Sequence, residues 1–195
     1  MSPPRGTARL QSASLYAGAI SDPPGEAALV VRVMRGDREA LGELYSEFAP
    51  GLYAAAFRLL GERSDAEDVT HEMFARLPQL LAGWDASRGA LGPWLRRVAV
   101  RLALMRLRSG RRRREVDVDA VASLLAPAEE PHERLTMADA LGRLAEEQRV
   151  VFLLKEVEGY SHAEIATLLD ISVRNSEVRL FRARQALRAF LGSRR

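Results

Sequence analysis

One stretch of the chain, residues 88–114, holds ten arginines and no acidic residue. Between the arginines, apolar residues recur at the spacing expected for one face of an α-helix; they are Leu95, Val98, Leu102 and Met105, with Trp94 next to them. Pro93 suits the first turn of such a helix, where its missing N–H group costs nothing. The stretch therefore predicts an amphipathic helix with one face in a protein core and another face covered by guanidinium groups.

The arginine face of this helix is the first candidate binding surface. At 100° per residue, Arg97, Arg101 and Arg108 project within about 40° of one another. A solvated basic face would explain one such arginine, but ten without a compensating acid indicate a surface that binds a polyanion. Lys155 is the only lysine. Arginine favours forked contacts to phosphates or bases, although a GC-rich coding sequence would produce the same bias.

Composition excludes several other classes of protein. With 195 residues, 47% hydrophobic and 28% charged, the chain suits one globular domain or two small ones. It has no cysteine, and its three histidines lie far apart, so we expect no disulfide and no metal site. No apolar run approaches the length of a membrane span, so we expect no membrane insertion and a cytoplasmic protein. No nucleophile–base pair or glycine-rich phosphate loop is present, so we expect no catalytic residue and no cofactor.

The N-terminal half predicts a helical domain over residues 26–114. Residues 1–25 are rich in Ser, Pro, Gly and Ala, which favours a disordered tail over a transit peptide. Helical periodicity begins at Glu26, and Asp37 is expected to cap a long helix that ends at Gly61 and kinks near Pro50.

An acidic helix follows. Ser64-Asp65-Ala66-Glu67 has the pattern of a capping box, which predicts a helix start at Ser64. Asp65, Asp68 and Glu72 then lie on one face; the helix dipole explains the first two but not Glu72, which lies beyond the first turn. This face fits a docking site for a basic partner, and a solvated face fits equally well. Pro78 is expected to bend or end the helix, and residues 82–92 are expected to form a loop.

The composition becomes acidic after Arg114, and we interpret residues 115–130 as a linker to a second domain, residues 131–195. There, Ser161-His162-Ala163-Glu164 predicts a capping box that opens a short helix. Asp170 is expected to adopt the left-handed conformation, and Ser172 to cap a last helix that runs to about Leu191. A short helix, a tight turn and a longer basic helix form a helix-turn-helix, whose second helix enters the DNA major groove. A helical hairpin that does not bind DNA is the alternative.

The order of these parts resembles one known family. Residues 65–74 (Asp-Ala-Glu-Asp-Val-Thr-His-Glu-Met-Phe) look like conserved segment 2.2 of the extracytoplasmic-function (group IV, sigma-70 family) RNA polymerase sigma factors. The stretch from Trp84 to Ala99 resembles the segments that follow it. Residues 146–152, 159–161, 164–166, 172–173 and 179–184 resemble domain 4 of the same family, so the likeness covers about residues 26–191.

The resemblance implies an all-α protein of two small helical domains, a region 2 bundle and a region 4 helix-turn-helix, joined by a flexible acidic linker. It implies a sigma factor that binds core RNA polymerase and directs initiation at −10 and −35 promoter elements, with no catalytic activity of its own. The implied partners are the β′ clamp helices and the β subunit of the polymerase, promoter DNA and an anti-sigma factor.

The resemblance also implies roles for particular residues. Core docking would use Asp65, Glu67, Asp68 and Glu72. Recognition and opening of the −10 element would use Trp84, Arg88, Arg96, Arg97, Arg101 and Arg108. Trp94, near the apolar stripe, is expected to be core rather than a stacking platform. Recognition of the −35 element would use Ser172, Arg174, Asn175, Arg179 and Arg182.

The chain departs from the family in the helix-turn-helix. Asp170 stands where the family usually has glycine, and Asn175-Ser176-Glu177 replaces a common Thr-Val-Lys. Ser176 is expected to weaken the domain modestly, and Glu177 is expected to neutralise Arg174 or Arg179 rather than read a base. A stand-alone helix-turn-helix regulator that binds DNA as a homodimer is the alternative function, but such a protein needs neither the acidic helix nor the first basic helix.

Overall fold

The computed structural model describes residues 23–116 and 137–192, and within these ranges the chain is helical, without strands. The expected tail over residues 1–22 and most of the expected linker lie outside the described residues. The first domain consists of α1 (Pro23–Met34), α2 (Arg38–Leu60), α3 (Arg63–Ala75), α4 (Leu77–Leu80), the short turns η1 (Leu81–Gly83) and η2 (Ala86–Arg88), and α5 (Leu91–Val116). The second consists of α6 (Met137–Gly142), α7 (Glu146–Phe152), the π-helical turn η4 (Leu153–Val157), α8 (His162–Leu169) and α9 (Val173–Gly192). The all-α prediction is confirmed.

Most helix ends in the first domain lie where local sequence signals predict them. Asp37 caps α2 by accepting hydrogen bonds from the backbone N–H groups of Glu39 at 2.9 Å and Ala40 at 3.2 Å. Gly61 ends α2 in the left-handed conformation, with φ of 74°. Pro50 lies inside α2, which continues through it. Pro78 acts as predicted, because α3 ends at Ala75 and the proline lies in the first turn of α4.

Three predicted boundaries differ. The capping box at Ser64 is wrong: α3 begins at Arg63, and the Glu62 carboxylate accepts from the Arg63 N–H at 3.1 Å. Gly61 ends α2, and α3 begins only two residues later with Glu62 as its N-cap. Ser64 therefore lies within the first turn of α3 and not at the capping position. α1 begins at Pro23, three residues before the predicted domain start, and α5 continues to Val116, two residues into the predicted linker.

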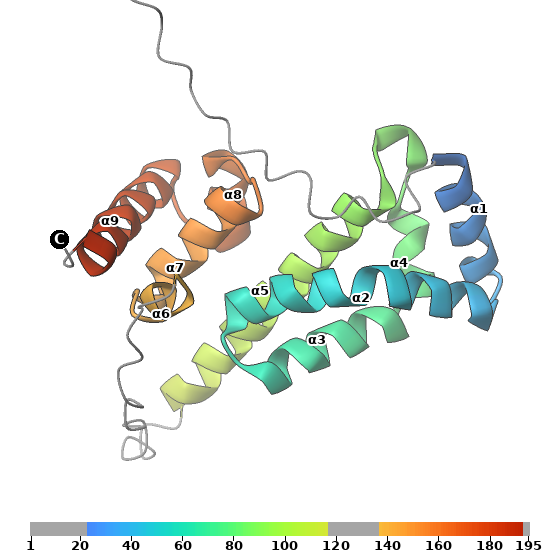
Figure 1. The fold of residues 1–195 in the computed structure, drawn as a ribbon, viewed down its shortest axis with the longest axis horizontal. Helices are drawn as coiled ribbons and strands as arrows, with labels where there is room; N and C mark the ends of the chain where they lie inside the picture. Colours follow the sequence, from blue (N-terminus) through green and yellow to red (C-terminus); the bar gives the residue numbers. More distant parts are fainter. Residues whose placement is uncertain (1–22, 117–136, 193–195) are drawn as a thin grey trace, which may run out of the picture.

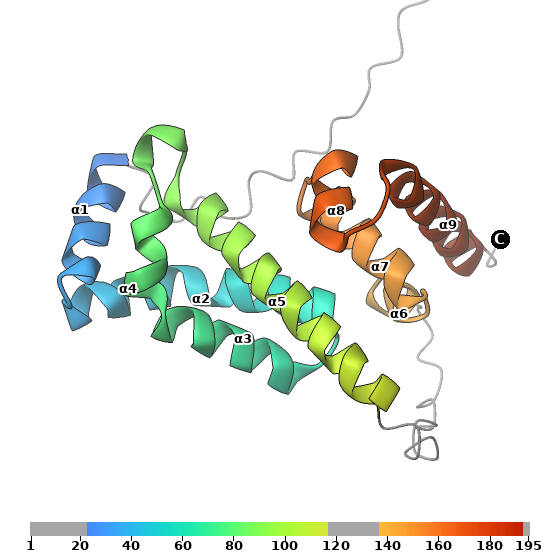
Figure 2. The same cartoon turned by 180° about the vertical axis from the view of Figure 1, so that it is seen from behind.

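The long helices α2, α3 and α5 lie side by side and form the body of the first domain (Figures 1 and 2). The face of α5 that enters the core repeats every four residues, through Leu91, Leu95, Ala99 and Ala103, each at most 1% exposed. Met105, expected on this face, is 63% exposed. The buried face differs from the predicted stripe because α5 packs against neighbours on two sides, which also buries Val100 and Leu104.

The second domain contains the predicted helix-turn-helix, formed by α8 and α9. Ser161 and Glu164 form the capping box at the start of α8. Asp170 has a φ of 54°, as predicted, and the Ser172 hydroxyl accepts from the Asn175 N–H at 3.1 Å. Ser176 is fully buried, and its hydroxyl lies 2.9 Å from Nδ1 of His162. The buried hydroxyl is therefore hydrogen-bonded, which offsets part of the cost expected for a polar group at this position.

The two domains contact each other in this structure (Figure 1). A single apolar cluster contains Ala56, Leu59, Val100 and Leu104 of the first domain together with Val151, Leu154, Tyr160 and Ile165 of the second. In the described ranges, no helix is both long enough and apolar enough to cross a membrane.

Candidate functional site

The acidic face of α3 is paired with arginines from its own domain. The Arg106 guanidinium of α5 donates to Asp65 at 2.8 Å and to Asp68 at 2.6 Å. Glu67 pairs with Arg63, and Glu72 with Arg76, each at 3.0 Å and one turn away on the same helix. The hydrogen bond to Asp65 contributes most to raising the pKa of Arg106.

These pairs are exposed and exchangeable. The side chains of Asp68 and Glu72 are 58% and 49% exposed. Exposed ion pairs contribute only about 0–1 kcal/mol each, because water and salt screen them. A basic partner that brings its own cations can therefore replace Arg106 and Arg76 at little cost. Asp65, Asp68 and Glu72 lie on one side of α3, and Glu67 lies about 100° around the helix from Asp68; we call these four carboxylates the acidic α3 face.

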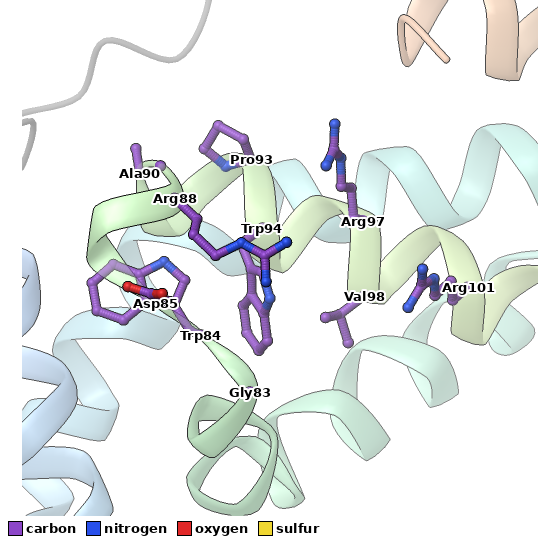
Figure 3. Close-up of a pocket in the computed structure, with 11 residues that line it drawn as sticks. Gly83, Trp84, Asp85, Arg88, Ala90, Pro93, Trp94, Arg97, Val98 and Arg101 are labelled. Atoms are coloured by element: carbon purple, nitrogen blue, oxygen red, sulfur yellow. The ribbon is translucent and has the colours of Figure 1, made fainter. Parts of the chain in front are cut away.

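A cavity of about 540 Å³ lies where the η1–η2 loop meets the first turns of α5. Its lining includes two tryptophans, Trp84 and Trp94, and three arginines, Arg88, Arg97 and Arg101. Figure 3 shows Trp84 and Arg88 on the loop and Trp94, Arg97 and Arg101 on α5. Both indole rings also pack against the core of the domain, so Trp94 is at once a core residue and part of the cavity wall. We call this feature the α5 cavity.

Local hydrogen bonds shape the loop that forms one side of the α5 cavity. The Asp85 carboxylate accepts from the Ser87 hydroxyl at 2.7 Å and from its backbone N–H at 2.9 Å. These bonds lower the pKa of Asp85, so the turn keeps its charged acceptor at neutral pH. Gly89 follows with a φ of 141°, a conformation that L side chains rarely adopt.

Glu26 of α1 anchors the other side of the same loop. It is 5% exposed, and its carboxylate accepts from the backbone N–H of Leu91, the first residue of α5, at 2.9 Å. A carboxylate at a helix N-terminus satisfies an otherwise unpaired N–H group and interacts favourably with the helix dipole. α1 therefore holds the start of α5, and with it the arginines of the α5 cavity, in place.

The structure brings together four of the six residues predicted for −10 recognition. Trp84, Arg88, Arg97 and Arg101 line the α5 cavity, whereas Arg96 and Arg108 do not. Arg96 donates to the Glu158 carboxylate and Arg108 to the Leu168 carbonyl, both in the second domain. Their hydrogen-bond partners, and not the helical spacing, place these two side chains against the second domain.

The residues predicted for −35 recognition extend from Ser172, just before α9, to Arg182 at the middle of that helix. Arg174, Asn175 and Arg182 are exposed, and Ser172 serves as the cap described above. Arg179 is only 20% exposed and pairs with Glu147 of α7 at 2.8 Å. Its partner is thus Glu147, and Glu177, expected to neutralise Arg174 or Arg179, forms an ion pair with neither among the described residues.

Three residues of the site were not predicted: Glu26, Arg106 and Glu158. Each acts through a partner at least 38 positions away in the sequence. No local pattern signals such a contact, since helical periodicity reports only neighbours three or four positions apart.

Comparisons with known proteins agree on one family. Residues 44–113 match Sigma-70 region 2, and residues 134–187 match Sigma-70, region 4. The ECF RNA polymerase sigma factor SigE of Mycolicibacterium smegmatis is 35% identical over 172 residues, which cover 80% of this chain and 64% of that relative's length. The ECF RNA polymerase sigma-E factor of Escherichia coli is 32% identical over 177 residues, which cover 82% of this chain and 90% of the relative.

Solved structures give the same result for the fold. CnrH in complex with the cytosolic domain of CnrY has a TM-score of 0.51 at 26% identity, covering 89% of this chain and 100% of that one. The sigma factor RpoE in complex with the anti-sigma factor NepR from Bartonella quintana has a TM-score of 0.55 at 20% identity, covering 79% and 98%. The second of these, at its lower identity, bears on the fold alone.

Proposed function

The chain belongs to the extracytoplasmic-function sigma factors of the sigma-70 family, and on that premise we propose which of its surfaces performs each step of initiation. A sigma factor binds RNA polymerase and promoter DNA, and it is an initiation factor rather than an enzyme. This membership sets aside the alternative of a stand-alone helix-turn-helix regulator.

The acidic α3 face docks on core polymerase, at the β′ clamp helices, and the second domain contacts the β subunit. Four carboxylates on one helix supply the charge that a basic helical partner needs, and their present arginine partners are exposed enough to be exchanged. Arg106 then serves to hold Asp65 and Asp68 in position until the partner arrives.

Charge reversal tests this docking role. Replacing Asp65, Asp68 and Glu72 by arginine should reduce binding to purified core polymerase by at least tenfold, or about 1.4 kcal/mol, with the helical circular dichroism unchanged. Glu43→Arg is the matched control, because Glu43 is another exposed carboxylate with an arginine partner, Arg32 at 3.0 Å. Unchanged core binding in the triple variant would remove the docking role.

The α5 cavity takes up a base of the −10 element, and this cavity is the observation that carries the proposal. Opening a duplex requires that an extruded base be held by stacking and polar contacts. A space of about 540 Å³, walled by two indole rings and bordered by three arginines, offers both kinds of contact. The Nε1 atom of Trp84 is buried and has no hydrogen-bond acceptor in the described part of the chain.

Substitutions that keep the tryptophans test this role without disturbing the core. Arg88, Arg97 and Arg101 are exposed, so replacing all three by alanine should leave the fold intact. Binding to a forked DNA with a single-stranded −10 region should weaken, and the salt slope should fall by about 1 for each of these arginines that binds a phosphate in the wild-type protein. Arg35→Ala, at an exposed arginine after α1, is the control. Equal promoter opening by the triple variant and wild type would refute the assignment.

The start of α9 reads the −35 element in duplex DNA. Arg174, Asn175 and Arg182 project from the exposed side of the second helix of a helix-turn-helix, where side chains reach base edges in the major groove. Arg179, paired with Glu147, supports the helix or contacts a phosphate. An anti-sigma factor is proposed as a further partner; the RpoE structure, which shares this fold, holds a sigma factor with the anti-sigma factor NepR. Co-purification of this chain with a candidate anti-sigma protein tests that proposal.

A further inference from the structure

The second domain covers part of the arginine face of α5 through one carboxylate. Glu158 follows η4, and its side chain is only 3% exposed. It accepts from Nε and Nη2 of Arg96, the latter at 3.0 Å, and from Nη2 of Arg58 at 3.5 Å. Both arginines belong to the first domain. A buried carboxylate needs such partners, so this one is compensated only while the two domains are in contact.

Other groups of the second domain also face α5. Arg108 donates to the carbonyl of Leu168, near the C-terminus of α8, where the helix dipole is negative and carbonyls lack helical partners. Burial raises the pKa of the Tyr160 phenol, and the nearby charges of Arg97 and Arg101 oppose this. The Glu158 carboxylate and the Leu168 carbonyl of the second domain thus bind arginines of α5. Phosphates of a nucleic acid would bind the same guanidinium groups.

The contact between the domains is imperfectly packed. A cavity of about 290 Å³ lies between them, with Leu107 and Gly110 on one side and Leu144 and Arg149 on the other. The Nε atoms of Arg58 and Arg149 are buried and have no acceptor among the described residues. Buried donors without acceptors cost free energy. These features are typical of an interface that forms and dissociates, in contrast to the tightly packed core of the first domain.

We propose that the second domain binds reversibly to the arginine face of α5, with Glu158 as the anchor, and competes there with DNA. In this closed state Arg96 and Arg108 are occupied by the chain itself, while the α5 cavity stays accessible. Separation of the domains frees both arginines for phosphates and returns Glu158 to water. The competition rests on the proposed role of α5 in binding DNA, but the closed state itself does not.

The first experiment measures closure without DNA or polymerase. The chain has no cysteine, so Ser109→Cys in α5 and Ala145→Cys just before α7, both exposed and next to residues that line the cavity between the domains, give two spin-label sites in the full-length protein. Electron–electron double resonance should show mainly the short distance of the closed structure for wild type. Glu158→Gln and Glu158→Lys should shift the distribution to longer distances.

A matched control lies two residues away. Glu156 pairs with Arg184 at 2.6 Å, but Arg184 belongs to the same domain, so Glu156→Gln should leave the distances unchanged. The exchange variant Glu158→Arg with Arg96→Glu should restore the short distance. A wild-type distribution without the short distance, or one that Glu158→Gln and Glu156→Gln change equally, overturns the closed state. Thermal unfolding of each variant verifies that it is folded.

The second experiment measures competition. With a random-sequence single-stranded 12-mer as the probe, Glu158→Gln should bind several-fold more tightly than wild type, with a salt slope larger by about 1 or 2 for the released arginines. Glu156→Gln should match wild type. If Glu158→Gln opens the domains but binds the 12-mer no more tightly, the competition is refuted while the closed state stands. If the polymerase and promoter tests fail but the distances behave as expected, the proposed function alone is refuted.

Discussion

The helices α5 and α9 are both long, basic and amphipathic, but they use their arginines differently. On α5, Arg96, Arg106 and Arg108 bind groups of the protein itself, in the second domain or on α3. On α9, Arg179 and Arg184 pair only within their own domain, whereas Arg174 and Arg182 are exposed, and neither of these two forms an ion pair with any described residue. Both helices would be classed as nucleic-acid-binding by composition. An arginine-rich helix can therefore stabilise the protein by pairing with its own groups, or it can bind DNA. The two roles are distinguished only by the groups that the arginines contact.

The largest effect is expected where α5 acts as a core helix. Leu95 is fully buried at its centre. Leu95→Ala should lower the free energy of unfolding by about 2–5 kcal/mol, because it removes apolar packing and leaves a cavity. Met105→Ala on the same helix and Phe181→Ala on α9, both at least 60% exposed, should stay within about 0.5 kcal/mol of wild type. Urea denaturation measures all three, and a small loss for Leu95→Ala would contradict the core role of α5.

The next largest effect distinguishes the arginines of α9 that contact DNA from those that stabilise the domain. Arg182→Ala should weaken binding to −35 duplex DNA by about 1–3 kcal/mol if the side chain contacts a base, with stability unchanged. Arg179→Ala breaks the pair with Glu147 and should lower stability by at most about 1 kcal/mol, with a smaller loss of DNA affinity. Anisotropy titrations and thermal melts measure the two quantities. Equal losses of affinity in both variants would show that the Glu147 pair opens on DNA.

A smaller effect concerns the buried hydrogen bond between α8 and α9. A double-mutant cycle with Ser176→Ala and His162→Ala should give a coupling free energy of about 0.5–1.5 kcal/mol, the usual net value of one hydrogen bond. Chemical denaturation of the four proteins measures it. A coupling near zero would mean that Ser176 is simply a buried polar residue that weakens the domain.

The smallest effect is a pH dependence at the start of α8. Hydrogen bonds from the Ser161 backbone N–H, first, and then from its hydroxyl lower the pKa of Glu164 below its ordinary value of 4.5. The charged form is favoured by folding, so the contribution to stability is present above pH 4.5 and is lost as the pH falls through the folded-state pKa. The difference in melting temperature between wild type and Glu164→Gln should therefore shrink below pH 4.5. A constant difference would exclude this linkage.

Local signals predicted much of the fold. Asp37, Gly61, Asp170 and the Ser161 capping box lie where the sequence places them, because each acts on backbone groups within four residues of itself. The Ser64 capping box failed for a related reason: the same pattern occurs, but Gly61 and Glu62 start the helix earlier. Of the residues predicted for −10 recognition, Trp84 and Arg88 of the loop meet Arg97 and Arg101 of α5 in one cavity, since the loop leads directly into α5 and the two arginines of α5 lie one turn apart.

The sequence by itself determined the all-α class, the two-domain order and the helix-turn-helix, because these depend on composition, periodicity and spacing, and its motifs carried the resemblance to the family. The tertiary structure alone decided which arginines are free and which are occupied. Arg106 faces Asp65 and Asp68, and Arg96 faces Glu158, across separations that no helical period connects. The sequence states which residues are charged, but the partner of each charge depends on how helices distant in the sequence pack. Packing therefore determines whether an arginine pairs with a carboxylate or remains accessible to DNA.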